Sequence, residues 1–342
     1  MMMLDGQQGE TEPTESGIVP ASRRAAHPGR GWLWFVGIAL SVAVMARYPM
    51  LGVACLAMGL RTQSERFGAK GFLLGLGIAV AVLLLWMVRS GVSSVLFAIP
   101  LVGVSAAIAA LMWKRRAGVT AVSLVIAAAI ALTMSVDAIS AARAGTDLAE
   151  ATTSMLMEIA RLSAGRGVQA ELTLASAEPI MELIWPLTYV LSVAFDALVA
   201  GFGSFLGSVQ RPVPRDAAPS TVVPGRVPQI SRFDAPLWSG GVIALSVLGM
   251  GASFADIPGA QLLRTVSVTL FLSVRIIFMV QGFAVALALV NRWRIGCVGR
   301  VAIIVFALWL EVMFIMSIIG LIDVWANFRK LPREGSRAEA HL

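Results

Sequence analysis

The sequence predicts an all-α fold, a polytopic transmembrane bundle of eight or nine helices. Residues of the set AVILMFWYC make up 58% of the 342 residues and charged residues only 14%, against roughly 45–50% and 25% in soluble domains. The mean hydropathy is +0.82, and the chain is long enough for eight or nine spans of about 20 residues with short loops. These values indicate a multi-pass membrane protein, surrounded by membrane lipid.

The first 31 residues precede any apolar segment. Acidic side chains come first and arginines follow, and Pro13, Pro20 and Pro28 interrupt the stretch without apolar periodicity. Residues 1–31 are therefore predicted to be a disordered cytoplasmic tail. A secretory signal peptide is not expected, because the acidic start and the late apolar segment do not match a short basic region followed by a compact apolar one.

Nine apolar segments follow this tail. The first two are short and flank Arg47-Tyr48-Pro49, where proline removes a backbone donor and restricts its predecessor, so a tight hairpin or a broken helix is expected. Residues 32–136 form an N-terminal transmembrane block and residues 183–328 a C-terminal one. The segments lie at about 32–46, 50–60, 71–88, 92–112, 118–136, 183–207, 237–255, 265–290 and 301–322.

The distribution of Lys and Arg predicts the orientation, because cytoplasmic loops carry an excess of both. With the N-terminus inside, the basic clusters at 61–70, 114–116 and 292–300 all lie on the cytoplasmic side. The rule fails at the end, since nine spans would leave the basic tail, residues 329–342, outside. Either one segment does not fully cross, the short pair around Pro49 or the last one, or the tail breaks the rule.

Two connections are long enough to have their own structure. Residues 137–182 are acidic and are predicted outside, where Met155, Ile159 and Leu162 recur at helical spacing. An amphipathic helix is expected there, either packing on the membrane or bundle or covering a binding cavity, with a break near 165–167. The cytoplasmic loop 208–236 is rich in proline and reads as a semi-extended linker or a docking site for a partner.

Glu178 and Glu182 lie near the outer end of the sixth apolar segment. Their spacing of four residues places both carboxylates on one helical face, just before Trp185. Two carboxylates there could attract a cation or serve as acid and base. The alternative is that they are solvated loop residues, since nothing else in the sequence supports hydrolysis.

Metal, redox and nucleophilic chemistry lack the residues that they need. Cys55 and Cys297 are isolated, with no Cys-x-x-Cys or Cys/His spacing, and His27 and His341 lie in the tails. No cofactor, metal site or catalytic residue is therefore predicted, and the chain is not expected to be an enzyme. The net charge of +7 comes from basic residues between apolar segments, so nucleic-acid binding is not expected either.

Polar side chains within the apolar segments are the candidates for a site. Ionisable groups at membrane depth are expensive and face a bundle interior or a wet cavity. Asp196, Arg275 and Glu311 lie inside three segments, Asp323 closes the last one, and the amide of Gln281 needs a partner across helices or from a ligand. Arg275 is expected opposite Asp196 or Glu311, in a structural ion pair or in a substrate or proton site. The predicted substrate-binding residues are Asp196, Arg275, Gln281 and Glu311.

Three stretches of the C-terminal half stand out: Trp185-Pro186-Leu187-Thr188-Tyr189, the Gln281-Gly282 pair and the closing Gly320-Leu321-Ile322-Asp323. Together they resemble the YybS-like family of bacterial polytopic membrane proteins, which implies the bacterial inner (cytoplasmic) membrane as the location. The resemblance covers residues 32–331, and its most specific parts are the Gln281-Gly282 pair and the closing Gly320-Leu321-Ile322-Asp323 with Phe328-Arg329-Lys330. It extends to Trp185-Pro186-Leu187-Thr188-Tyr189 and Phe195-Asp196-Ala197-Leu198. The helical layout of the family is similar to that of the substrate-binding S-components of energy-coupling-factor transporters. The resemblance therefore implies a small molecule bound within the bundle and an energising membrane protein as partner.

Two hypotheses follow. The first is a membrane protein that binds or transports a small solute, with a polar cavity lined by the four predicted residues. The second is a non-transporting scaffold or accessory protein that recruits partners through its cytoplasmic loops, in which those residues form closed pairs.

Overall fold

The structure is a computed structural model of the chain and describes residues 31–164, 167–209, 233–255, 258–293 and 296–329. Every regular element within these ranges is a helix, which confirms the predicted all-α class. The expected tail up to residue 30, residues 210–232 of the Pro-rich loop and residues 330–342 of the basic tail lie outside the described residues. The helices are α1 (Gly31–Met45), α2 (Pro49–Ser90), α3 (Ser93–Leu96), α4 (Ala98–Trp113), α5 (Val119–Ala144), α6 (Leu148–Ala164), α7 (Val168–Val209), α8 (Leu237–Ala252), α9 (Ala260–Arg292), α10 (Cys297–Val312) and α11 (Ile315–Ala326).

Four of these helices, α2, α5, α7 and α9, are long and apolar enough to cross a membrane, and the bent pair α10–α11 would make a fifth span. These helices suggest a membrane-embedded protein. The number is smaller than the eight or nine expected, for two reasons. The helix α2 takes in two of the expected segments, and the apolar helices in α1, α4 and α8 have fewer than 18 residues each.

Proline and glycine create the two reversals at the N-terminal end of the bundle. Pro49 starts α2 at the first helical position, where its missing N–H is tolerated, so the hairpin expected around Arg47-Tyr48-Pro49 is confirmed. Within α2, Gly68 leaves the helical conformation with φ of 64°, which glycine adopts without steric penalty. A Cβ at Gly75 would touch the Leu60 side chain, so the two halves of α2 pack against each other.

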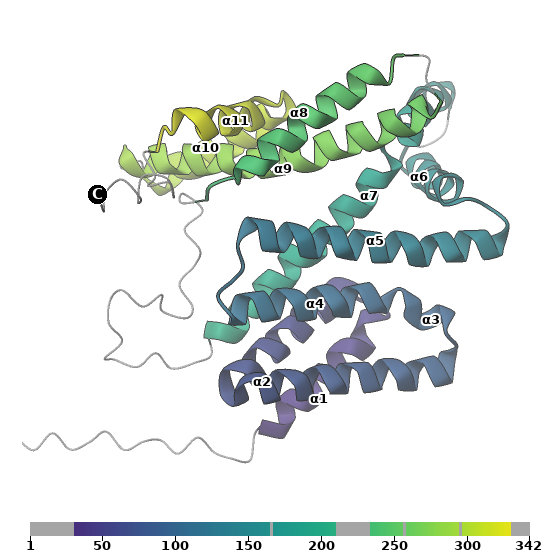
Figure 1. Cartoon of the computed structure of the whole chain (residues 1–342), viewed down its shortest axis with the longest axis vertical. Helices are drawn as coiled ribbons and strands as arrows, with labels where there is room; N and C mark the ends of the chain where they lie inside the picture. The colour runs from purple at the N-terminus through teal and green to yellow at the C-terminus, as the bar shows by residue number, and fades with distance from the viewer. Residues whose placement is uncertain (1–30, 165–166, 210–232, 256–257, 294–295, 330–342) are drawn as a thin grey trace, which may run out of the picture.

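Two groups of helices share α7 as their common neighbour. The N-terminal core is built from apolar side chains of α1, α2, α4, α5 and α7, and a smaller core joins α8, α9 and α11. In Figure 1 the helices α1–α4 and α8–α11 lie on opposite sides, with α5 and α7 between them. The helix α7 contacts α2, α4, α5, α6 and α9. It therefore connects the two groups and carries side chains toward the space between α4, α5 and α6.

The last two helices bend back on themselves. The axes of α10 and α11 differ by 97° across a break of a few residues. Just after α11, the Nη1 atom of Arg329 donates to the carbonyl oxygen of Phe233 at 2.5 Å, beside the start of α8. Trp238 at the start of α8 donates in turn to Thr120 at the start of α5, at 3.1 Å. The end of α11 and the starts of α5 and α8 therefore share one end of the bundle.

Candidate functional site

Arg275 forms its ion pair with Glu311, one of the two predicted partners. The Nη2 atom of Arg275 donates to the Oε1 atom of Glu311 at 2.5 Å and to the carbonyl oxygen of the same residue at 2.9 Å. Its Nε atom donates to Ser317 at 3.3 Å, and the guanidinium carbon lies 3.5 Å from the centre of the Phe314 ring. Arg275 thus contacts α10, the break and α11 at once.

Glu311 holds the other side of this break. Its Oε2 atom accepts from the backbone N–H of Ser317 at 3.0 Å, in the first turn of α11, and its Oε1 atom accepts from the Ser317 hydroxyl at 2.7 Å. A carboxylate is favourable at a helix N-terminus, where backbone N–H groups are otherwise unsatisfied. Phe314 adopts φ of 63°, which costs a non-glycine residue about 1–2 kcal/mol. The group is a closed structural network that stabilises the bend.

Gln281 belongs to a second closed network, at the end of the bundle where α11 finishes. Its Oε1 atom accepts from the backbone N–H of Ala235 at 2.6 Å, and its Nε2 atom donates to Asp323 at 3.0 Å. Asp323 is fully buried and also accepts from the Nη2 atom of Arg329 at 2.7 Å. The amide thus found its partners across helices, and the network joins α9, α11 and the residues before α8.

The same pair of helices meets at two glycines. A Cβ at Gly282 would collide with the carbonyl oxygen of Met316, and a Cβ at Gly320 would collide with that of Phe278. The close approach of α9 and α11 therefore requires both glycines. The Gln281-Gly282 pair and the closing Gly320-to-Arg329 segment, which are far apart in the sequence, form one contact.

Asp196 lies apart from both networks, in the wall of a cavity of about 1070 Å³. Its side chain is 9% exposed, and its carboxylate makes no hydrogen bond or ion pair with the residues that the structure describes. The cavity lies between α4, α5, α6 and α7 and the turn that joins α1 to α2. Asp196 is the last of the lining residues along α7, and the others precede it on the helix. Those others are Thr188, Tyr189, Ser192 and Val193.

This cavity, here named the inner cavity, has mainly apolar walls. Phe97, Pro100, Leu101 and Val104 line it from the start of α4. Besides Asp196, its charged lining residues are Asp137 on α5 and Arg47 in the turn before α2. A mainly apolar hollow with a few polar groups is typical of a small-molecule site.

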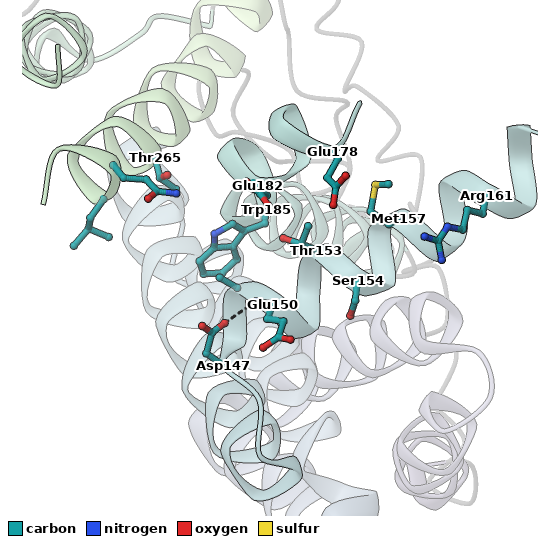
Figure 2. Close-up of a pocket in the computed structure, with 13 residues that line it drawn as sticks. Asp147, Glu150, Thr153, Ser154, Met157, Arg161, Glu178, Glu182, Trp185 and Thr265 are labelled. Atoms are coloured by element: carbon teal, nitrogen blue, oxygen red, sulfur yellow. Dashed lines mark hydrogen bonds between the residues drawn. The ribbon is translucent and has the colours of Figure 1, made fainter. Parts of the chain in front are cut away.

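A second cavity, the outer cavity, lies between α6, α7 and the start of α9 and has a volume of about 700 Å³. Four of its lining residues are acidic and one, Arg161, is basic. Figure 2 shows the carboxylates of Asp147 and Glu150 on one side and those of Glu178 and Glu182 on the other. Glu178 and Glu182 therefore line one hollow, as their spacing predicted.

The helix α6 forms a wall shared by the two cavities. Thr153, Ser154 and Met157 face the outer cavity, whereas Thr152 and Leu156 face the inner one. The helix predicted within residues 137–182 is present as α6, and it lines the inner cavity. A hydrogen bond of 3.3 Å joins the Thr152 hydroxyl on α6 to the Tyr189 hydroxyl on α7.

The four predicted substrate-binding residues do not share one site. Asp196 lines the inner cavity, whereas Arg275, Gln281 and Glu311 line neither cavity and belong to the two closed networks.

Two arginines with structural contacts were missed in the sequence. Arg329 was not assigned a contact, although a buried Asp323 needs a cation nearby. Arg61 was treated as a loop residue, whereas Arg61 is buried in α2 and pairs with Glu65 at 2.5 Å. The spacing of four residues between Arg61 and Glu65 was the available signal.

Metal binding has no support in the described part of the chain, where no three His, Cys, Asp or Glu side chains could together hold an ion. Comparison of the sequence with protein-family models and with curated proteins, and of the structure with solved structures, finds no match.

Proposed function

We propose that this chain is an integral protein of the bacterial inner membrane that binds a small solute in the inner cavity and passes it across or into the membrane. The observation that carries the proposal is Asp196, a carboxylate 9% exposed that makes no hydrogen bond or ion pair with any described residue and lines a large, mainly apolar cavity. An isolated acidic side chain at membrane depth costs about 2.5–3.5 kcal/mol on insertion scales. Such groups are usually functional and find a partner, and a bound solute would supply one.

The proposed topology has eight crossings and one re-entrant pair. The crossings are α1, the two halves of α2, α4 with α3, α5, α7, α8 and α9, and the pair is α10–α11. This arrangement keeps both chain termini in the cytoplasm and removes the conflict with the basic tail, because the last apolar segment enters and leaves on the same side. The contact of Arg329 with Phe233 supports it.

Labelling of single cysteines with a membrane-impermeant maleimide will test this topology. In a chain carrying Cys55→Ser and Cys297→Ser, we expect Ser336→Cys and Ser220→Cys to react from the same face of the membrane. Thr146→Cys, between α5 and α6, should react only from the opposite face. Labelling of Ser336→Cys together with Thr146→Cys would contradict a re-entrant pair.

The proposed membership of the YybS-like family draws on the residues at the contact between α9 and α11. Gln281, Asp323 and Arg329 are the polar part of that contact, and Gly282 and Gly320 allow the close approach. A solute cavity within the bundle agrees with the similarity of that family to transporter S-components. An energising membrane protein is the partner that this similarity implies.

Retention of a solute through purification tests binding directly. We expect native mass spectrometry of the detergent-purified chain to detect a bound small molecule, and Ser192→Trp, which fills the inner cavity, to abolish it. Ser154→Trp in the outer cavity is the matched control and should retain the molecule. Equal spectra for the three proteins would contradict binding in the inner cavity.

A scaffold without transport is the alternative, and the closed networks around Arg275 and Gln281 favour it. In those networks the predicted residues pair with one another or with neighbouring side chains and backbone groups. A scaffold function does not explain why Asp196 lines a large cavity without a described partner. The cavity-filling variant separates the two functions, because a scaffold would tolerate Ser192→Trp without losing any bound molecule.

A further inference from the structure

We infer that the solute of the inner cavity is an organic cation with an apolar body, and that the outer cavity concentrates it before it binds beside Asp196. This inference rests on the proposed function and specifies the class of solute. It combines one buried carboxylate without a described partner, the composition of the cavity walls and the sequence of carboxylates along α7.

The first step is the chemistry of the Asp196 carboxylate, which lines the inner cavity. Asp196 offers an acceptor only, unless it is protonated. A buried carboxylate is favoured in its charged form by an opposite charge within about 4–6 Å. The described residues supply no ion pair, so the cationic group of a solute is the complementary partner.

The second step is the polarity of the other residues that line the inner cavity. The α4 side chains are apolar, and the hydroxyl groups of Thr133 and Ser140 on α5 donate to carbonyl oxygens of their own helix. Those hydroxyls are therefore already satisfied as donors. The walls are mainly apolar and carry the carboxylates of Asp196 and Asp137. They fit an apolar body that carries a positive charge better than they fit a sugar or another polyhydroxylated solute.

The third step is the order of acidic groups. Glu178 and Glu182 line the outer cavity, and Asp196 lines the inner one further along α7. Asp147, just before α6, and Glu150 in its first turn face the outer cavity, so its lining carries four acidic groups and one basic group, Arg161. A hollow lined with one sign of charge raises the local concentration of the opposite ion.

Only two basic side chains line the two cavities in the described part of the chain, and both are exposed. The Arg161 side chain is 64% exposed and lies 3.9 Å from Glu158. Arg47 at the turn before α2 is the other cationic side chain that lines either cavity, and it is exposed too. Solvent screens exposed charges strongly, so the buried Asp196 decides which solute charge is accepted.

Two ions of nearly equal shape and opposite charge test the sign of the solute. Equilibrium dialysis of the full-length chain in detergent, with empty micelles subtracted, will give Kd values for tetraphenylphosphonium and tetraphenylborate. We expect the phosphonium to bind at least about tenfold more tightly, and Asp196→Asn to weaken its binding by about tenfold or more. Weaker binding of the phosphonium than of the borate, equal binding of both ions, or an unchanged Kd in Asp196→Asn would overturn the inference.

The role of the outer cavity has its own control. The double variant Glu178→Gln/Glu182→Gln should weaken phosphonium binding about threefold at low salt, and the difference should vanish at about 1 M salt, where charges are screened within about 3 Å. Glu171→Gln/Asp234→Asn removes the same charge from side chains that line neither cavity, and should leave the Kd unchanged. Equal effects of the two double variants would overturn the concentrating role.

Failure of this inference and failure of the proposed function remain distinguishable. If the borate binds better while Ser192→Trp still abolishes retention of a molecule, solute binding stands and the solute is not a cation. If neither ion binds and no molecule is retained, both are wrong. Thermal unfolding of each variant will show whether Asp196→Asn keeps the fold, as the matched size of its amide leads us to expect.

Discussion

Replacing Arg329 by alanine is expected to lower the free energy of unfolding by about 3–5 kcal/mol, the range for removing one member of a buried ion pair. The Arg329 side chain is 4% exposed and donates to Asp323, which is fully buried, and to the carbonyl oxygen of Phe233. Alanine would remove the cation from beside that carboxylate and leave the carbonyl oxygen without this donor. The contact of α11 with the residues before α8 would weaken as a result.

Unfolding by SDS in mixed micelles will measure this change. Arg161→Ala is the matched control, because Arg161 is 64% exposed and its contact with Glu158 is 3.9 Å long, so its loss should change stability by less than about 1 kcal/mol. The double variant Asp323→Asn/Arg329→Gln, which removes both charges, should be more stable than Arg329→Ala alone. Similar unfolding of Arg329→Ala and Arg161→Ala would show that the buried pair does not stabilise the fold.

Gly320→Ala is expected to destabilise the chain by at least about 2 kcal/mol, as overpacking of a close helix contact does. The added methyl group would overlap the carbonyl oxygen of Phe278, which is backbone and cannot rotate away. The helices α9 and α11 would have to separate, and the hydrogen bond between Gln281 and Asp323 would lengthen with them.

The matched control for Gly320 is Gly241→Ala in α8, where a new Cβ meets no atom within 4 Å. That change should be neutral or slightly stabilising, because alanine favours a helix over glycine by about 0.5–1 kcal/mol. The same SDS unfolding measurement compares the two variants. A Gly320→Ala protein as stable as Gly241→Ala would contradict a tight contact between α9 and α11.

Residues close together in the sequence were sufficient to predict part of the fold. Pro49 predicted the first reversal, because a missing N–H and a fixed φ act on the nearest residues alone. Segments 50–60 and 71–88 were predicted separately and form the two halves of α2 on either side of Gly68, but the polar residues between them look like a loop in the sequence. Residues 61–64 are nevertheless buried, and burial depends on packing with distant segments.

The bend between α10 and α11 could be inferred from the sequence only indirectly. Neither proline nor glycine lies at Met313-Phe314, so the segment reads as one continuous apolar helix. The break depends on Arg275, 36 residues before Glu311, and on the Glu311 carboxylate. The conflict of the basic tail with the orientation rule was the only sign in the sequence that the last segment is not a regular span.

The candidate site was also predicted from the sequence only in part. Charge alone predicted that Arg275 would meet Asp196 or Glu311, and the pairing with Glu311 is confirmed. Charge could not predict that Asp196 would have no partner among the described residues, because that depends on how α4, α5, α6 and α7 pack. The inner cavity likewise has walls from segments more than a hundred residues apart.

The bend between α10 and α11 has a consequence for biogenesis. The two helices have 16 and 12 residues, and the 97° bend prevents them from forming one straight span of about 20 residues. The groups that hold them, Arg275, Gln281 and the backbone at Phe233, are synthesised earlier. The pair α10–α11 is therefore completed last, against groups that are already synthesised. A chain that stops before Asp323 would lack the contact of α11 with Gln281 but keep that of Ser317 with Glu311.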